Sequence, residues 1–254
     1  MLRHSLKPPW LSLSVLLEWG PVHDALRPGL QKEGFGSAEE VRVLRNAHLA
    51  RVRAMFATAD VFVFTLGLTE AWESSVDGTV YPTAPGVIAG NYDPERYRFV
   101  NFSYPEIRAD LEAFISMAQE INPGLRLLLT VSPVPLAATA SDSHVLLATT
   151  YSKSTLRAVA GDLANTRKDV TYFPSYEIIT GQPARHGFYA PDLRNVVDAG
   201  VNEVMRHFFP PEFANTVVAT ERAPSDKGVT KGNLAESAEA GFEHCEEALL
   251  GRIQ

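Results

Sequence analysis

Three short apolar runs along the chain predict strands. Residues 61–66 read VFVFTL, residues 125–131 read LRLLLTV and residues 169–173 read DVTYF. The first run is continuous and rich in Val and Phe, which is typical of a strand covered on both faces. We therefore expect three strands, each within about three residues of these bounds.

Segments with an apolar residue every three or four positions predict helices between and beside these strands. Ser37 and Ser103 are each followed three residues later by Glu, a pattern that caps a helix N-terminus. Ser152 is interpreted as the N-cap of a third helix, and Lys153 as a solvated residue of its first turn. The predicted helices cover residues 37–59, 103–122, 152–168 and 200–209.

The alternation of helices and strands indicates an α/β fold. Consecutive strands joined by helices need crossover connections, so the sheet should be parallel and covered on both faces, with right-handed connections. Residues 73–104 and 132–151 follow no helical period and are predicted as loops, with a small hairpin around Asp77-Gly78 in the first of them.

Composition and charge narrow the function. The 254 residues carry a formal net charge of −7, which argues against binding along a phosphate backbone. Mean hydropathy is −0.06 and no run of 18 apolar residues occurs, so no membrane span is expected. One cysteine, Cys245, cannot form an internal disulfide, and a signal peptide at the N-terminus is not favoured, so we expect a cytoplasmic protein.

The two ends differ from the middle. Residues 1–23 are expected to be an irregular segment, residues 24–210 the main domain, and residues 211–254 an acidic linker followed by an amphipathic helix. That helix carries apolar residues every three or four positions from Leu234 to Ile253. It could dock on the domain or bind a protein partner, and the sequence leaves both open.

Polar residues after the predicted strands are the candidates for chemistry, because ligands bind at the carboxyl ends of parallel strands. After the first strand, the Gly67 amide could donate to an oxyanion, with Thr69 and Glu70 beside it. Gly67 could equally serve only as a tight turn. Ser132 follows the second strand, where a turn hydroxyl is the plainer interpretation.

His144 lies on the loop after the second strand and could act as a general base, with Asp142 orienting its ring. A structural loop histidine is the competing interpretation. The chain has no Gly-x-Gly-x-x-Gly, phosphate-loop or Gly-x-Ser-x-Gly motif, and no metal-ligand spacing, so neither a metal nor an organic cofactor is expected.

Five motifs in order resemble the GSCFA domain family, which is related to the SGNH or GDSL hydrolases. The resemblance covers roughly residues 24–209 and implies a three-layer α/β/α sandwich around a parallel sheet, SGNH-hydrolase or flavodoxin-like. The motifs are Phe64-Thr-Leu-Gly-Leu-Thr-Glu-Ala-Trp72, Leu129-Thr-Val-Ser-Pro-Val-Pro135, His144-Val, Tyr151-Ser-Lys-Ser-Thr-Leu-Arg157 and Tyr172-Phe-Pro-Ser-Tyr-Glu177.

The resemblance implies serine-based ester hydrolysis or acyl transfer on a small-molecule or carbohydrate ester. Gly67, Thr69 and Glu70 match the block that elsewhere reads Gly-x-Asn-Asp and helps form the oxyanion hole. His144 is assigned the role of base, and Ser132 is the substitute nucleophile to test.

Two departures from the family pattern change the expectation. The usual late Asp-x-x-His is here Pro191-Asp-Leu-Arg-Asn195, without histidine. The Gly-Ser-Cys-Phe-Ala segment that carries the family's serine is absent, so the fold is expected to be incomplete at the N-terminus and the chain to be a poor esterase. The alternative is a non-catalytic binding protein that keeps the fold.

Overall fold

The computed structural model describes residues 16–17, 22–184 and 187–209, and these divide into two compact units. The parallel unit contains residues 53–69 and 102–209 of the described chain. The antiparallel unit contains the described residues up to 52 and residues 70–101. The fold is mixed α/β, with helices beside a parallel three-stranded sheet and a second, small antiparallel sheet.

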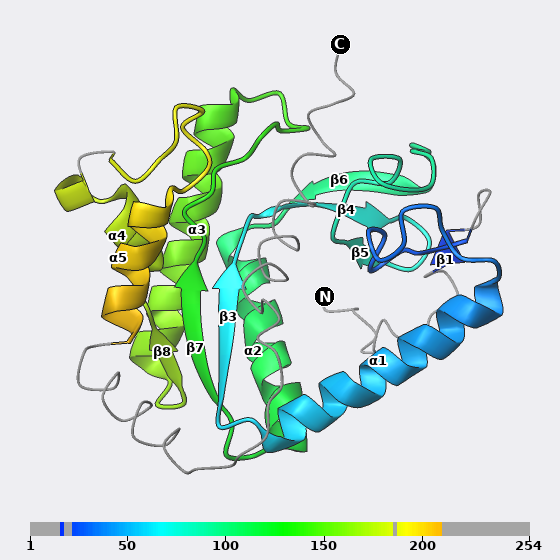
Figure 1. Ribbon diagram of the computed structural model, residues 1–254, viewed down its shortest axis with the longest axis horizontal. Helices are drawn as coiled ribbons and strands as arrows, with labels where there is room; N and C mark the ends of the chain where they lie inside the picture. The colour runs from blue at the N-terminus through cyan, green and yellow to red at the C-terminus, as the bar shows by residue number, and fades with distance from the viewer. Residues whose placement is uncertain (1–15, 18–21, 185–186, 210–254) are drawn as a thin grey trace, which may run out of the picture. The chain divides into compact units, whose positions relative to one another are not determined.

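The parallel sheet confirms the three predicted strands. They are β3 (Val61–Leu66), β7 (Arg126–Val131) and β8 (Val170–Tyr172), lying in the order β3-β7-β8. The ladder pairs Leu66 with Val131, and every pairing is parallel. Figure 1 shows the arrows of β3 and β7 side by side and pointing the same way, so both strands end at the same edge.

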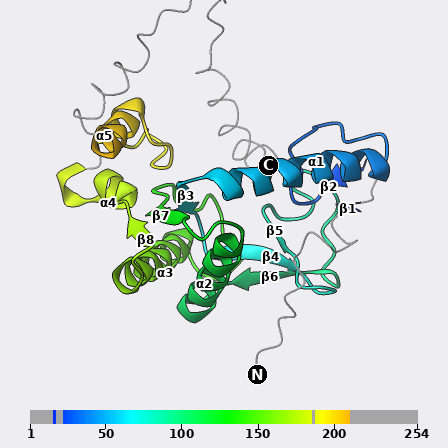
Figure 2. The same ribbon diagram turned by 90° about the horizontal axis from the view of Figure 1, so that it is seen from below.

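Helices lie on both faces of this sheet (Figure 2). Helices α2 (Tyr104–Ile121) and α3 (Val145–Thr166) cover one face, and α4 (Ser175–Thr180) and α5 (Asp198–Phe208) lie on the other. The core forms where alternate residues of β7 meet α2 and α3. Its fully buried members include Ile115, Leu127, Leu129, Val131, Val159 and Leu163.

One strand differs from the expectation of a sheet covered on both faces. Phe62 and Phe64 of β3 pack against Phe114 of α2. On the opposite face Val61 and Val63 are 43% and 47% exposed. The reason is position: β3 is the edge strand, whereas α4 packs against the middle strand β7.

The third long helix begins earlier than predicted. Residues 132–151 were expected to form a loop, but α3 starts at Val145 and runs to Thr166. Ser152 and Lys153 therefore lie two turns inside the helix and are buried, so the interpretation of an N-cap and a solvated lysine is wrong. The apolar face of α3 begins at Ala148, which brings both residues toward the sheet.

The antiparallel unit occupies most of the predicted long loop. Strand β4 (Glu70–Ser74) pairs with β5 (Val80–Tyr81) in the hairpin expected around Asp77-Gly78. It also pairs with β6 (Tyr97–Asn101), a strand that the sequence did not reveal. Gly78 adopts a left-handed φ of 73°, which suits a glycine in the turn.

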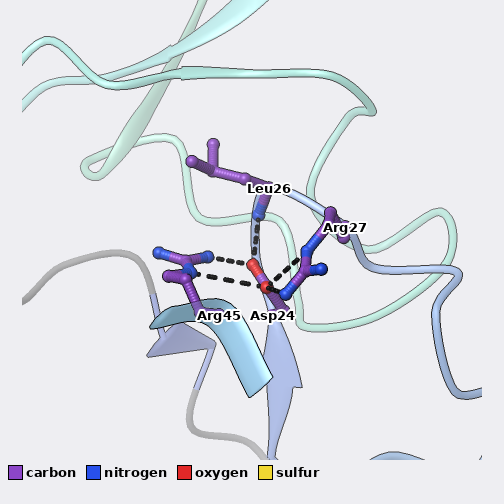
Figure 3. A network of polar contacts seen from close by, with 4 residues as sticks. All are labelled: Asp24, Leu26, Arg27 and Arg45. Atoms are coloured by element: carbon purple, nitrogen blue, oxygen red, sulfur yellow. Dashed lines mark hydrogen bonds and ion pairs between the residues drawn. The ribbon is translucent and has the colours of Figure 1, made fainter. Parts of the chain in front are cut away.

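A buried carboxylate ties together the start of this unit. The Asp24 side chain is fully buried, at the end of strand β2 (His23–Asp24), and forms ion pairs with Arg27 and Arg45. One of its oxygens also accepts the Leu26 N–H at 3.1 Å (Figure 3). Arg45 belongs to helix α1 (Ala38–Thr58), so the carboxylate joins this helix to the strand.

The remaining expectations vary in outcome. Helices α1, α2 and α5 confirm their predicted positions. Not every apolar residue that recurs at helical spacing in them is covered, since Leu44, Val201 and Met205 are exposed. Residues Leu16–Leu17 form strand β1, which pairs with β2.

The predicted C-terminal linker and amphipathic helix lie outside the described residues. Short α4 and a 3₁₀ turn at Gln182–Ala184 were not predicted.

Candidate functional site

The loops after β3 and β7 meet at the carboxyl edge of the parallel sheet. The Ser132 N–H donates to the Leu66 carbonyl at 2.9 Å, which extends the ladder by one bond beyond the paired ends of the strands. Gly67 and Ser132 therefore lie on neighbouring segments at this edge. The sequence predicted this proximity from the order of strands and loops.

Helix α3 holds the loop after β3 through two buried side chains. The Lys153 Nζ donates to the Gly67 carbonyl at 2.8 Å, and the lysine is only 2% exposed. The Ser152 Oγ accepts the Thr69 N–H at 2.7 Å, and both residues are buried. A hydrogen bond from a charged donor is stronger than a neutral one, so Lys153 is the main fixing contact.

These bonds set the direction of the loop amides. No cis peptide bond occurs in the described chain, and in a trans peptide unit the C=O and the N–H point in opposite directions. Because the Leu66 carbonyl is turned toward the end of β7, the Gly67 N–H points away from β7. Because the Gly67 carbonyl is turned toward α3, the Leu68 N–H points away from α3.

Thr69 and Glu70 follow the two amides that the bonds to β7 and α3 orient. The Thr69 N–H is taken by Ser152, so this amide holds the loop rather than facing a ligand. Glu70 begins β4, where it pairs with Asn101, and so belongs to the antiparallel unit. Gly67 and Leu68 are the two loop positions whose amides are turned away from a supporting element, Gly67 from β7 and Leu68 from α3.

Ser132 lies in a tight turn at the end of β7. Its Oγ accepts the Val134 N–H at 3.2 Å, and the side chain is half-buried. The Tyr189 hydroxyl donates to the Pro133 carbonyl at 2.8 Å and fixes the same turn. Burial raises the pKa of Tyr189 to about 12, so this phenol stays protonated and remains a donor at neutral pH.

His144 is the N-cap of α3 and is exposed. Its Nδ1 accepts the Leu146 N–H at 3.2 Å, which leaves the ring proton of the neutral form on Nε2. Nine residues separate it from Lys153, about 13 Å along the helix axis. Asp142 is exposed in the preceding loop. The hydrogen bonds that join Gly67, Thr69, Ser132, Ser152 and Lys153 into one network do not extend to His144 or Asp142.

A cavity of about 350 Å³ lies beside Gly67, within the parallel unit. The end of β3 and its loop contribute Phe64, Leu66 and Leu68, and α2 contributes Ile107 and Phe114. Among the described residues that line it, Asp110 is the one charged side chain. We call this space the β3–α2 cavity.

The sequence signal for Ser152 and Lys153 was present but was interpreted wrongly. Ala148, Ser152, Leu156 and Val159 recur at helical spacing, so a helix that starts before Ser152 turns its hydroxyl toward the sheet. The motif around Tyr151-Ser-Lys153 was also part of the family resemblance. A lysine is rarely buried without a partner, so its burial could not be predicted from polarity alone.

Two features are absent from the described residues: a cluster of metal-ligand side chains and a membrane-spanning helix. They contain no group of three or more His, Cys, Asp or Glu side chains close enough to hold a metal ion. In the same part of the chain, no helix has the length and apolar character needed to cross a bilayer.

Comparison with known proteins gives the family. No protein of curated function matches the chain. The sequence model of the GSCFA family matches residues 9–208, well over half of the chain, and this range includes the loop after β3, the turn at Ser132 and all of α3. The chain therefore belongs to the GSCFA family.

Proposed function

We propose that the chain is an SGNH-like domain that binds an acyl ester at the carboxyl edge of its parallel sheet and hydrolyses or transfers the acyl group slowly. The observation that carries the proposal is the loop after β3. Lys153 and Ser152 hold this loop. The bond from Ser132 to Leu66 turns the Gly67 N–H away from β7, and the bond from Lys153 to Gly67 turns the Leu68 N–H away from α3. Preorganised N–H donors stabilise the oxyanion that forms when an ester carbonyl is attacked.

Slow turnover follows from the nucleophile and the base. Serine-based acyl transfer needs a nucleophile, a base that takes its proton, and donors for the oxyanion, held together. Ser132 is the candidate nucleophile, His144 the candidate base and Asp142 its orienting carboxylate. His144 would act through Nε2 only after moving its proton to Nδ1, which breaks the bond from Leu146. The donors alone support weak catalysis.

The test is hydrolysis of p-nitrophenyl acetate by the purified protein, beside Ser132→Ala and His144→Ala. We expect low turnover that neither substitution changes, because the Ser132 Oγ is held within its own turn and His144 caps α3, so the histidine does not activate the serine. Ser116→Ala, an exposed hydroxyl on α2, is the matched control. Rapid turnover by the wild type would contradict the proposal of slow turnover. If Ser132→Ala abolished that rapid turnover and Ser116→Ala preserved it, Ser132 would be the nucleophile.

A non-catalytic binding function is the second candidate. The observation that favours it is the position of His144, exposed and engaged as a helix cap rather than directed at a serine. Binding of an acyl compound without any hydrolysis would select this function. A carbohydrate ester remains a proposed substrate, and a protein partner of the C-terminal segment remains a prediction.

A further inference from the structure

We propose that the β3–α2 cavity binds the acyl chain of a neutral ester, with the acyl oxygen at the Gly67 and Leu68 N–H groups. This inference rests on the proposed function and names the class of substrate: an ester of a medium-length, unbranched acid. Its starting point is that Gly67 and Leu68 belong both to the fixed loop and to the cavity wall.

The lining suits a hydrocarbon chain. Phe64 and Leu66 line one side of the cavity, and Ile107, Leu111 and Phe114 of α2 line the other. Ligand pockets usually measure about 300 to 1,000 Å³, so a cavity of about 350 Å³ is at the small end of that range. This favours one acyl chain over a whole lipid.

The charge of the wall suits a neutral compound. Asp110 lines the cavity on the exposed side of α2, and the protein carries a formal net charge of −7. A carboxylate has the same sign of charge as the protein as a whole and is repelled by it, whereas an ester or amide carbonyl is uncharged. The cavity should therefore prefer an uncharged acyl compound to a free fatty acid.

The loop amides supply the polar end of the site. The Gly67 N–H points away from β7 and the Leu68 N–H points away from α3, and both residues line the cavity. The Thr69 N–H is held by Ser152. An acyl oxygen should therefore shift the signals of the first two amides, both on the cavity wall, and leave the Thr69 signal nearly unchanged.

The experiment is a titration of the ¹⁵N-labelled full chain with butanamide, hexanamide and octanamide, followed through the backbone amide signals. These amides carry the acyl carbonyl and are not hydrolysed by a weak esterase. We expect saturable shifts of the Gly67 and Leu68 signals, a much smaller shift at Thr69, and affinity that rises by up to about 15-fold for each two methylenes. Octanoate should bind less tightly than octanamide. In Asp110→Asn the affinities of the two compounds should lie closer together than in the wild type.

Two variants on the cavity wall and a matched control complete the test. Ile107→Trp fills the cavity from α2 and should abolish binding, whereas Met117→Trp, at an exposed position of the same helix, should not. If Ile107→Trp fails to fold, Leu68→Asp at the exposed rim should weaken octanamide binding by removing apolar contact and placing a charge there. Retention of full affinity in these wall variants would overturn the inference.

The outcomes separate the cavity from the esterase function. Binding that depends on chain length, without hydrolysis of any ester, would support the cavity and count against hydrolysis. Hydrolysis without chain-length preference, in a protein that does not bind octanamide, would overturn the cavity and leave the esterase function standing. Shifts confined to residues away from Gly67 and Leu68 would also overturn it.

Discussion

Replacing Lys153 with Ala is expected to lower the free energy of unfolding by about 3 kcal/mol. The substitution removes a charge-assisted hydrogen bond to the Gly67 carbonyl, an interaction of about 1.5–3 kcal/mol. It also leaves a void where the side chain was packed, because Lys153 is among the fully buried side chains. The loop after β3 should lose its fixed position at the same time.

The measurement is urea unfolding of the wild type, Lys153→Ala, Lys153→Met and Lys168→Ala. Lys153→Met keeps an apolar stem of similar length and should fall between the wild type and Lys153→Ala. Lys168 is exposed at the end of the crossover from α3, so its truncation should change stability by less than about 0.5 kcal/mol. Wild-type stability in Lys153→Ala would show that this lysine does not hold the loop.

Replacing Asp24 with Ala is expected to destabilise the antiparallel unit by about 3–5 kcal/mol. Removing one partner of a buried ion pair leaves the other charge uncompensated, and here both Arg27 and Arg45 lose their carboxylate. The Arg42–Glu39 pair on the surface of α1 is the matched control. Glu39→Ala should cost at most about 1 kcal/mol, because exposed pairs contribute little.

The same carboxylate makes the stability depend on pH. Burial raises the pKa of Asp24, but the hydrogen bonds from Arg45 and Arg27 outweigh burial, and the net pKa lies below its ordinary value of 3.8. The ionised Asp24 carboxylate therefore makes its full contribution to the free energy of unfolding above about pH 3.8. That contribution is lost as the pH falls through the lowered pKa. Chemical unfolding between pH 2 and 7 should show this loss in the wild type and a weaker one in Asp24→Asn. If the unfolding free energies of the wild type and Asp24→Asn changed with pH in the same way, Asp24 would be excluded as the source of the pH dependence.

The parallel sheet could be predicted because its strands depend on local composition. The runs at residues 61–66 and 126–131 are apolar and bounded by turn signals, so their identity does not depend on distant contacts. Strand β6 (Tyr97–Asn101) was missed because its five residues are too few for a clear period and follow a Gly- and Pro-rich stretch, and its place in a sheet comes from pairing with β4.

The site was predicted as a location but not as a set of contacts. The order of elements indicated that the loops at Gly67 and Ser132 share one edge. The order of elements could not show that α3 begins at Val145. The position of this helix start has two consequences for the site. It buries Ser152 and Lys153 against the loop, and it carries His144 two turns or more away from them. Helix boundaries are the least predictable feature of a sequence, and here the chemistry depends on one.

The central claim is that the donors for an acyl oxygen are held in place while no serine is activated beside them. A fluorophosphonate probe tests it directly, because such a probe reacts rapidly only with an activated serine. Incubation with the full chain, followed by peptide mass spectrometry, should give slow and substoichiometric labelling that Ser132→Ala does not alter. Rapid, stoichiometric labelling of one serine, at Ser132 or elsewhere, would contradict the claim and establish a complete catalytic centre.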